Sequence, residues 1–431
     1  MERTIQNFDA LAESELRRDA LAIAEAGYEA INVGNVLRRK LLIQNDALQI
    51  DGHSVSINLQ NRKIFFVGIG KCAFAATEAI EKLLGDRLTG GIAFDVLPTK
   101  PMFAKIETFI GTHPLPSEEN VRATARIFEL LANRTTEDLV IMLISGGGST
   151  LLCSPEAPMT PDDESELFKK LTASGATIQD MNTVRKHTSR ARGGGLARAA
   201  YPAEVIALIV SDVPGNDVEF ISSGPTVLDP STVADAEAVL ARYAITPAAN
   251  ITFIETLKEE KYFERVTNVL FLTSREALMA MRDEAVRRGY AAEIVDEHFT
   301  GEARDIGRTV IEKLHTAKPK TVFLYAGEST VTLGGSSGVG GRNQEMVLAA
   351  LEGILPDEII LPFASDGHDN TDFAGAIGDE LSHTHALAKN LSVSEYLNAH
   401  HSYDFFSTTG DALRTGYTGS NVSDLIIALK N

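Results

Sequence analysis

A glycine-rich stretch with an arginine at its end is the clearest sign of chemistry in this chain. It occupies residues 326–345, after an apolar segment and before a segment of helical character. Five of the eight residues from 334 to 341 are glycine, and Arg342 follows them directly; the glycines are Gly334, Gly335, Gly338, Gly340 and Gly341. Glycine allows positive φ and close approach of the backbone to a ligand, and bare amides beside a guanidinium bind oxyanions such as phosphate. The stretch therefore predicts a phosphate-binding loop, with a flexible surface loop as the alternative.

A shorter glycine turn with a lysine lies nearer the start of the chain. Residues 68–73 read Gly-Ile-Gly-Lys-Cys-Ala after an apolar segment, which fits the G-x-G-x-x-A pattern of dinucleotide-binding folds. Asp95 lies near the end of the next apolar segment, where that pattern places a ribose-binding acid. Lys71 departs from the pattern because it puts an ammonium group beside the ligand. Three interpretations stay open: a dinucleotide site, an anion site that uses Lys71, or a loop with a solvated lysine.

A third glycine turn, Ser-Gly-Gly-Gly-Ser, occupies residues 145–149 and also follows an apolar segment. The backbone amides of Gly146, Gly147 and Gly148 suit an oxyanion, with a tight structural turn as the alternative. Neither flanking serine lies in the G-x-S-x-G sequence that surrounds a hydrolase nucleophile. The chain also contains no Walker A sequence, which disfavours an ordinary P-loop ATPase.

Positive charge is concentrated around residues 185–192 of a protein whose formal net charge is −19. Arg185, Lys186 and His187 are followed by two further arginines and three consecutive glycines. Guanidinium and ammonium groups bind carboxylates and phosphates. We expect these three residues, together with Ser149, to bind an anionic substrate; a solvated helix surface is the alternative for one or two of them.

Carboxylates in three loops could bind magnesium, which takes oxygen ligands from protein and phosphate together. Asp212 follows the apolar segment 204–210, Asp366 follows the segment 359–364, and Glu328 precedes the glycine-rich stretch. We predict Asp212 and Asp366 as metal ligands and Glu328 as part of the nucleotide site. Several anion sites with separate carboxylates fit phosphoryl transfer to a small anionic acceptor, because that reaction depends on positioning and charge neutralisation.

The elements expected to position these loops are strands that alternate with helices. Strand-length apolar segments occur at residues 63–68, 91–96, 106–111, 139–144 and 204–210, and again at 266–272, 291–295, 321–325, 359–364 and 425–429. This spacing predicts an α/β protein with a parallel sheet covered on both faces, whose ligands bind at the carboxyl ends of the strands. A helical pair is expected over residues 8–42. A linker near residues 245–247 predicts two domains, residues 1–245 and residues 250–431.

Composition limits the possible partners. The chain has 431 residues, of which 44% are hydrophobic, so two soluble domains are expected. Its negative charge argues against nucleic acid or an anionic membrane as partner. Only Cys72 and Cys153 are present, and the first residues carry no hydrophobic signal segment, so a reduced cytoplasmic protein is expected. A homodimer is compatible with the sequence, which does not determine the oligomeric state.

The order of these motifs is the basis of a family resemblance that covers residues 8–430. The chain resembles the type II glycerate 2-kinases, also called the MOFRL family. The motifs that carry the resemblance are Gly68-x-Gly-Lys71, Ser145-Gly-Gly-Gly-Ser149, Arg185-Lys-His187, Ser211-Asp-Val-Pro-Gly215, Ser223-Gly-Pro-Thr226, Gly327-Glu-Ser-Thr-Val-Thr332, Gly340-Gly-Arg-Asn-Gln-Glu345, Asp366-Gly-x-Asp369 and Thr418-Gly-x-Asn-Val-x-Asp424.

The resemblance implies a fold and a reaction. It implies a Rossmann-like N-terminal domain, a smaller α/β C-terminal domain of the MOFRL type, and an active-site cleft between the two. It further implies ATP and Mg²⁺ as co-substrates and D-glycerate as acceptor, with 2-phosphoglycerate and ADP as products. The essential lysine and arginine of the family match Lys71 and Arg342.

Three other functions remain as alternatives. The G-x-G-x-x-A pattern fits an NAD(P)H-dependent hydroxypyruvate reductase, a label that many relatives carry. A kinase of another small hydroxy acid would use the same motifs. A sensor that binds small hydroxy acids without turnover would also use the same anion-binding residues.

Overall fold

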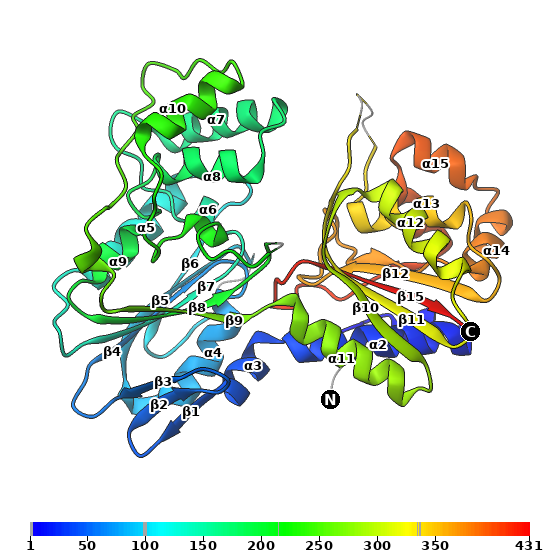
Figure 1. Ribbon diagram of the computed structural model, residues 1–431, viewed down its shortest axis with the longest axis horizontal. Coiled ribbons are helices and arrows are strands. Elements are labelled where there is room, and N and C mark those ends of the chain that lie inside the picture. Colours follow the sequence, from blue (N-terminus) through cyan, green and yellow to red (C-terminus); the bar gives the residue numbers. More distant parts are fainter. Residues whose placement is uncertain (1–2, 98–100, 214, 334, 336–337) are drawn as a thin grey trace. The chain divides into compact units, whose positions relative to one another are not determined.

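The computed structural model describes residues 3–97, 101–213, 215–333, 335 and 338–431, and the chain forms two compact α/β units. We call residues 33–212 and 216–271 the inserted unit. Residues 3–32, 213, 215 and the described part of 272–431 form the flanking unit. Figure 1 labels the larger elements of both units.

The inserted unit is built on a six-stranded sheet in the order β6-β5-β4-β7-β8-β9. The neighbouring pairs from β6 to β8 run parallel, which confirms the predicted parallel sheet. Every residue of β4 and β7 is buried, as expected for apolar strands covered on both faces. The strands are β4 (Ile64–Ile69), β5 (Leu88–Asp95), β6 (Ile106–Ile110), β7 (Leu139–Ile144), β8 (Glu204–Val210) and β9 (Val266–Leu272).

The order of these strands creates a topological switch point. The chain proceeds from β4 outward to β6 and then returns to build β7, β8 and β9 on the other side of β4. The loops that follow β4 and β7 therefore leave the same sheet edge in opposite directions, which is where ligands bind in open α/β sheets. The helices of this unit are α3 (Val33–Lys40), α4 (Ala73–Leu84), α5 (Glu118–Leu131), α6 (Gly148–Leu151), α7 (Pro161–Ala173), α8 (Ile178–Lys186), α9 (Gly195–Ala200) and α10 (Val233–Arg242).

Two features of the inserted unit were not predicted. The first is an antiparallel three-stranded sheet of β1 (Leu41–Gln44), β2 (Ala47–Ile50) and β3 (Val55–Asn58). Its strands have only four residues each, and β1 and β2 are joined by Asn45 and Asp46 with φ of 49° and 58°. Such short strands carry too little periodicity to be recognised. The second is the place of β9, which lies at the edge of the six-stranded sheet although it follows the expected linker in the chain.

The flanking unit contains a mixed sheet in the order β10-β11-β15-β12-β13-β14. β15 runs antiparallel to both β11 and β12, so β11 and β12 point the same way. The end of β11, the end of β12 and the start of β15 consequently meet at one edge. The strands are β10 (Ala291–Glu302), β11 (Thr321–Thr330), β12 (Glu358–Ala364), β13 (Gly375–Ala376), β14 (Ala412–Leu413) and β15 (Asp424–Lys430).

The helices of the flanking unit come from both ends of the described chain. They are α1 (Phe8–Leu11), α2 (Glu15–Ile31), α11 (Ser274–Arg287), α12 (Ala303–His315), α13 (Arg342–Leu351), α14 (Glu380–Ala388), α15 (Val393–Ala399) and α16 (Ser402–Thr409). Fully buried Arg17 on α2 forms an ion pair with Asp379, at the start of α14, at 2.6 Å. This pair links segments that are 362 residues apart. Among the described residues, no helix combines the length and apolar character needed to cross a membrane.

Candidate functional site

The structure brings the loops after β4 and β7 together at the switch point. The backbone N–H of Lys71 donates to the carbonyl of Gly146 at 3.0 Å. The Ser145 hydroxyl donates to the carbonyl of Ile69 at 3.0 Å and accepts from the N–H of Cys72 at 3.2 Å. The hydroxyl of Ser145 is therefore committed to joining the two loops.

Gly147 lies between two side chains that could act on a ligand. A Cβ atom at this position would lie 3.5 Å from Cγ of Lys71 and 3.6 Å from Cδ2 of His113. Gly147 also has φ of 87°, in the left-handed region that favours glycine. Lys71 and the predicted glycine turn thus form one local site.

The amides of this turn differ in their availability. The N–H of Gly148 donates to the carbonyl of Ser145 at 3.3 Å. Within the described part of the chain, no acceptor receives the N–H groups of Gly146 and Gly147. Consecutive unpaired amides around a left-handed residue form a concavity that suits an oxyanion. Two of the three predicted glycines therefore offer donors to a ligand, whereas Gly148 packs against Ser222, whose Oγ lies 2.2 Å from where a Cβ would be.

Three consecutive residues with left-handed backbone pack against the glycine turn of residues 145–149. Ser222, Ser223 and Gly224 have φ of 52°, 58° and 57°. The Ser222 hydroxyl donates to the carbonyl of Ser145 at 2.8 Å, and the Ser223 hydroxyl lies 2.9 Å from that of Ser149. Left-handed backbone at non-glycine residues is unfavourable and persists where the surroundings impose it, often near functional sites.

The predicted basic cluster divides into paired and unpaired members. Buried Lys186 pairs with Asp229 at 3.1 Å and with Glu219 at 3.2 Å. Buried His187 contacts the carbonyl of Ile254 at 2.9 Å and the hydroxyl of Ser231 at 3.2 Å. These two side chains hold the loops around the end of α8.

The two later arginines of this segment are also paired. Arg190 is exposed and pairs with Glu156 at 2.7 Å. Arg192 is buried and pairs with Glu164 at 2.6 Å. Both guanidinium groups are thus already compensated by carboxylates.

Arg185 has the opposite surroundings. Its guanidinium lies over the ring of Phe168, 4.3 Å from the ring centre, and its buried Nε has no hydrogen-bond partner. No carboxylate within the described ranges forms an ion pair with it. Burial, followed by repulsion from Arg192, lowers the pKa of Arg185 to about 10. A charged group that is removed from water without a partner is costly, so Arg185 is the member of the cluster best suited to receive an anion.

In the flanking unit, Arg342 is held by two carboxylates. Its Nε and Nη2 donate to the two oxygens of Asp424 at 2.5 and 3.2 Å, and its Nη1 donates to Glu328 at 2.6 Å. The register of β11 and β15 places Gly327 opposite Asp424, which brings the two carboxylates together. Burial disfavours the charge of Arg342, but attraction to Asp424 and Glu328 outweighs it and raises the pKa.

Asp369 fixes the start of the helix that carries Arg342. Its carboxylate accepts from the backbone N–H groups of Asn343 at 3.0 Å and Gln344 at 2.9 Å, so it caps α13. Gly341 approaches so closely that a Cβ there would lie within 2.2 Å of the Asp369 carboxylate. Burial, with repulsion from Asp424, raises the pKa of Asp369 to about 6. Asp369 lies in the same acidic loop as Asp366, and Asp424 lies in the last motif of the resemblance, but neither was predicted as a site residue.

The predicted glycine loop before α13 is mostly packed against its own unit. A Cβ at Gly338 would clash with the backbone of Ala399 and His400, and one at Gly340 would clash with Ser402. Gly335 has φ of 92° and open space around it. Gly334 lies outside the described residues. Several of these glycines are thus required by close packing.

The two predicted metal ligands follow strand ends, as expected. Asp212 is half-buried just after β8, and Asp366 is buried just after β12. One oxygen of Asp366 accepts from the N–H of His368 at 2.9 Å. Carboxylates at strand ends are suitable Mg²⁺ ligands, so the residues present fit the metal.

Another cluster of possible metal ligands is formed by Glu13, His385 and Asp411, whose ligand atoms lie within 4.8 Å of one another. Arg17 already pairs with Asp411 at 2.9 Å and with Glu13 at 3.4 Å. A guanidinium already pairs with both carboxylates of this cluster, which makes it less suited to a metal ion.

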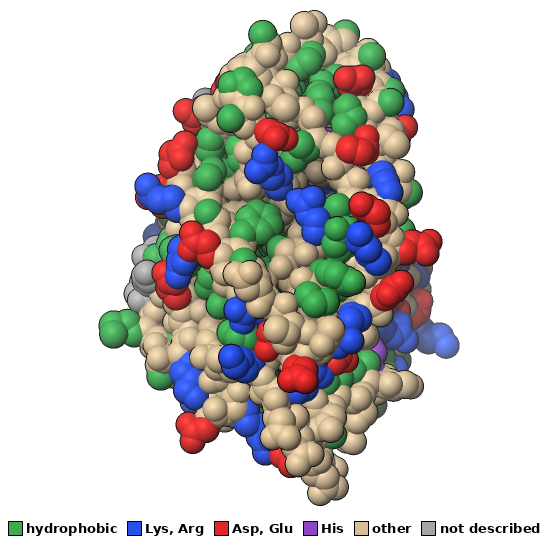
Figure 2. Space-filling model, turned by 90° about the vertical axis from the view of Figure 1, so that its left-hand side faces the viewer, with side chains coloured by type: hydrophobic (Ala, Val, Ile, Leu, Met, Phe, Trp, Pro, Cys, Tyr) green, Lys and Arg blue, Asp and Glu red, His purple; other side chains and the backbone are tan. Residues whose placement is uncertain are grey.

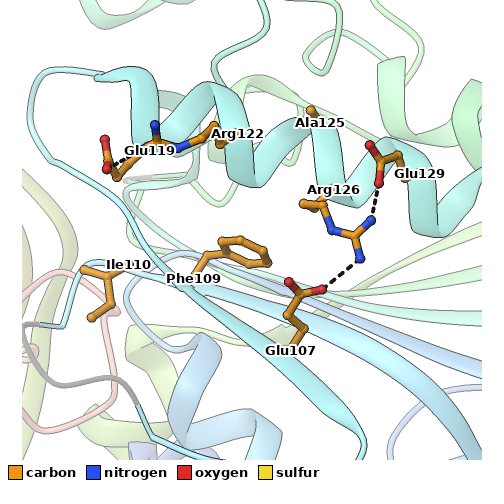
Figure 3. A pocket seen from close by; sticks show the side chains of 8 residues that line it. All are labelled: Glu107, Phe109, Ile110, Glu119, Arg122, Ala125, Arg126 and Glu129. Atoms are coloured by element: carbon orange, nitrogen blue, oxygen red, sulfur yellow. Dashed lines mark hydrogen bonds and ion pairs between the residues drawn. The ribbon is translucent and has the colours of Figure 1, made fainter.

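A cavity of about 560 Å³ between β6 and α5 is lined by arginines whose charges are paired with carboxylates. Arg126 pairs there with Glu107 at 3.0 Å and also with Glu129, and Arg122 pairs with Glu119 (Figure 3). On the face in Figure 2, Lys and Arg side chains are likewise interspersed with Asp and Glu, and the described residues form no continuous patch of either sign. The charged side chains on this face thus differ from Arg185, which forms no ion pair with the described residues.

Family models and relatives match most of the chain. Residues 19–258 match the model described as "Domain of unknown function (DUF4147)", and residues 321–424 match the MOFRL family. A glycerate 2-kinase of Pyrococcus horikoshii is 33% identical and covers 95% of each chain. The chain belongs to the type II glycerate 2-kinase, or MOFRL, family.

Other similar proteins are named either as glycerate kinases or as a putative hydroxypyruvate reductase. A D-glycerate 2-kinase of Thermotoga maritima is 33% identical over 85% of this chain and 90% of that protein. A crystal structure of a glycerate kinase from the same organism has a TM-score of 0.81, with 29% identity over 96% of this chain and 99% of that one. A putative hydroxypyruvate reductase of Agrobacterium vitis is 38% identical and covers 83% of this chain and 85% of that protein.

Asp95 bears on the reductase alternative. It is fully buried, and its carboxylate accepts from the N–H groups of Phe74 at 2.9 Å, Val96 at 2.6 Å and Leu97 at 3.3 Å. Burial raises the pKa of Asp95 to about 6, although these amides oppose the shift. An acid that is committed to backbone amides is poorly placed to bind a ribose, so this part of the dinucleotide pattern has a structural explanation.

Proposed function

We propose that this chain transfers the γ-phosphoryl group of ATP to the 2-hydroxyl of D-glycerate and forms 2-phosphoglycerate and ADP. Relatives named glycerate 2-kinase match nearly the whole chain, which supports the reaction class. The observation that carries the proposal is the pair of unpaired amides at Gly146 and Gly147 beside Lys71. Amides and an ammonium group at a switch point suit the oxygens of a phosphate.

The nucleotide is held by backbone groups in this proposal. The amides of Gly146 and Gly147 bind phosphate oxygens, and Lys71 compensates their charge. The loop of Gly335, Gly338, Gly340 and Gly341, which also includes Gly334, and the nearby Glu328 contribute to the nucleotide site. Gly148 and the packed glycines of the second loop act through the backbone shape they allow.

The acceptor is held by its carboxylate. Arg185 provides an unpaired guanidinium that can form charge-assisted hydrogen bonds with both carboxylate oxygens. Lys186 and His187 hold the end of α8 through Asp229 and Ser231, and so orient Arg185. Ser149 contacts the acceptor from the glycine turn.

Arg342 stabilises the charge that spreads over the transferred phosphoryl group. Asp424 and Glu328 fix its guanidinium before any ligand binds, so no reorganisation is needed during the reaction. Asp212 and Asp366 would hold Mg²⁺, which supplies charge neutralisation on the phosphates when bound. Cytoplasmic location and a homodimer stay predictions.

Product analysis tests the proposal directly. The purified chain is incubated with ATP, Mg²⁺ and D-glycerate, and the phosphorylated product is identified by ³¹P NMR against authentic 2- and 3-phosphoglycerate. We expect 2-phosphoglycerate with stoichiometric ADP, and no turnover in a folded Lys71→Ala variant. A 3-phosphoglycerate product would overturn the position of transfer, and the absence of ADP would overturn the kinase.

The same assay separates the alternatives. A hydroxypyruvate reductase would oxidise NADH or NADPH with hydroxypyruvate and without ATP, and we expect no such loss of nicotinamide absorbance. A kinase of another small hydroxy acid would show a higher kcat/KM for that acid than for D-glycerate.

A further inference from the structure

Ser149, Ser223 and Asn182 form a chain of hydrogen bonds whose donor-to-acceptor direction is fixed. The Nδ2 of Asn182 donates to the carbonyl of Ile178 at 3.0 Å, which determines how the side-chain amide is oriented. Its Oδ1 therefore faces Ser223, whose Oγ lies 2.8 Å away. An amide oxygen can only accept, so the single proton of the Ser223 hydroxyl lies in this bond.

The next bond of the chain follows from this assignment. The oxygens of Ser149 and Ser223 are 2.9 Å apart. Ser223 has already given its proton to Asn182, so Ser149 must donate and Ser223 must accept. Ser149 then has no proton left for a ligand and presents only oxygen lone pairs.

Ser223 cannot readily turn away from this arrangement. It is fully buried, and its carbonyl accepts from the N–H of Gly193 at 3.0 Å. The carbonyl of Gly224 accepts from the N–H of Gly194 at 2.8 Å, and Ser222 is tied to Ser145. Ser149 is partly exposed, so the open end of the chain is the one that a ligand can reach.

We infer that Ser149 is a specificity residue that accepts a hydrogen bond from a hydroxyl group of the substrate. A carboxylate or phosphate oxygen has only lone pairs and gains nothing from this position. Asn182 lies one helical turn before Arg185 on α8, so the same helix orients an anion receptor and, through Ser223, a hydroxyl receptor. This inference rests on the proposed function and names the residue that would distinguish hydroxy acids from acids without a hydroxyl group.

Calorimetric binding tests this inference without requiring turnover. The dissociation constants of D-glycerate and pyruvate, which has no hydroxyl group, are compared in the wild type and in Ser149→Ala. Loss of one neutral hydrogen bond should weaken D-glycerate about five- to tenfold. Pyruvate should be affected less than twofold. Equal weakening of both ligands would show that Ser149 donates to the carboxylate and would overturn the inference.

Two further variants check the role of the hydroxyl chain. Ser223→Ala leaves the Ser149 oxygen in place but frees its proton, so the preference for D-glycerate over pyruvate should fall. An unchanged preference would overturn the proposed direction of the chain. Ser174→Ala, at an exposed position of the same unit, should leave both constants unchanged.

The ligands also identify the hydroxyl involved. Hydroxypyruvate keeps the C3 hydroxyl and D-lactate keeps the C2 hydroxyl, so the one that Ser149→Ala weakens carries the contacted group. If neither is weakened while D-glycerate is, the contact requires both hydroxyls; if all ligands respond equally, the inference fails. Failure of the proposed function is distinct, because it appears as wild-type protein that forms no ADP.

Discussion

The arginines Arg342 and Arg185 of the two units differ in how their charge is compensated. In the flanking unit, Arg342 is enclosed by Asp424 and Glu328 and is aligned by both. In the inserted unit, Arg185 lies over an aromatic ring and forms no ion pair with any described carboxylate, although Glu164 attracts it from a greater distance. The buried carboxylate at the carboxyl edge of that unit's sheet, Asp95, receives backbone amides.

In the proposed reaction, this difference would give the two arginines separate roles. A guanidinium fixed by carboxylates keeps its position but has part of its charge compensated, which suits a group that acts on charge as it develops. An unpaired guanidinium has its full charge available and gains most when an anion arrives, which suits ground-state binding. We therefore expect the two arginines to affect different kinetic constants.

The largest effect is expected for Arg342→Ala. If Arg342 acts as proposed, removing this preorganised cation should lower kcat about 10³-fold, equivalent to about 4 kcal/mol, with little change in the KM for D-glycerate. Steady-state kinetics with ADP detection measure both constants. Arg308→Ala, which removes a half-exposed cation paired with Glu352 in the same unit, serves as control. A change confined to KM would mean that Arg342 contributes to binding of D-glycerate in the ground state, as expected for Arg185, and not to the transfer step.

The second prediction concerns Asp95 and the pH dependence of stability. Its pKa is raised to about 6 in the folded chain, above the ordinary value of 3.8. The folded state therefore holds this proton more tightly, and the stability that it contributes is lost as pH rises from about 4 through 6. Relative to Asp95→Asn, the unfolding free energy of the wild type should fall by up to about 3 kcal/mol across this window.

Denaturant unfolding of both proteins at several pH values measures this difference. The Asn variant has no proton to lose, so it removes only the contribution of this site. A difference that grew as pH rose would mean that Asp95 is stabilised as a carboxylate by a cation, and the contrast between the two sheet edges would then disappear.

The smallest effect is expected for Arg185→Ala. Loss of a charge-assisted contact to the carboxylate should raise the KM for D-glycerate about 30-fold, equivalent to about 2 kcal/mol, and leave kcat within a few-fold. Arg190→Ala is the matched control, because Arg190 lies in the same basic segment but is exposed and paired with Glu156. Equal effects of the two variants would mean that general positive charge, and not the unpaired guanidinium, attracts the substrate.

Local patterns predicted much of the fold. The apolar segments before Gly70 and Ser145 became the buried central strands β4 and β7, because a strand covered on both faces must be apolar throughout. The pairing of Arg342 with Asp424 could not be predicted in the same way. It depends on β15 inserting between β11 and β12, which joins residues 82 positions apart.

The basic cluster shows a second limit of the sequence. Arg185, Lys186 and His187 are adjacent, so each points about 100° away from the next around the end of α8. Their residue types suggest one shared role. Only the folded surroundings show that Lys186 meets the buried Asp229, whereas Arg185 meets the ring of Phe168.

The central place of β15 also constrains when the flanking unit can form during synthesis. β11 and β12 are bridged by β15, which follows both of them in the chain, so the sheet stays divided until residues 424–430 have been made. The inserted unit draws on residues 33–271 and can fold earlier. The ribosome would therefore hold a folded inserted unit while helix α2, which is made before that unit, has not yet met its partners in the flanking unit. Asp424 would reach Arg342 in one of the final steps of folding. A chain interrupted before β15 would contain a folded inserted unit, but the guanidinium of Arg342 in the flanking unit would lack the carboxylate of Asp424.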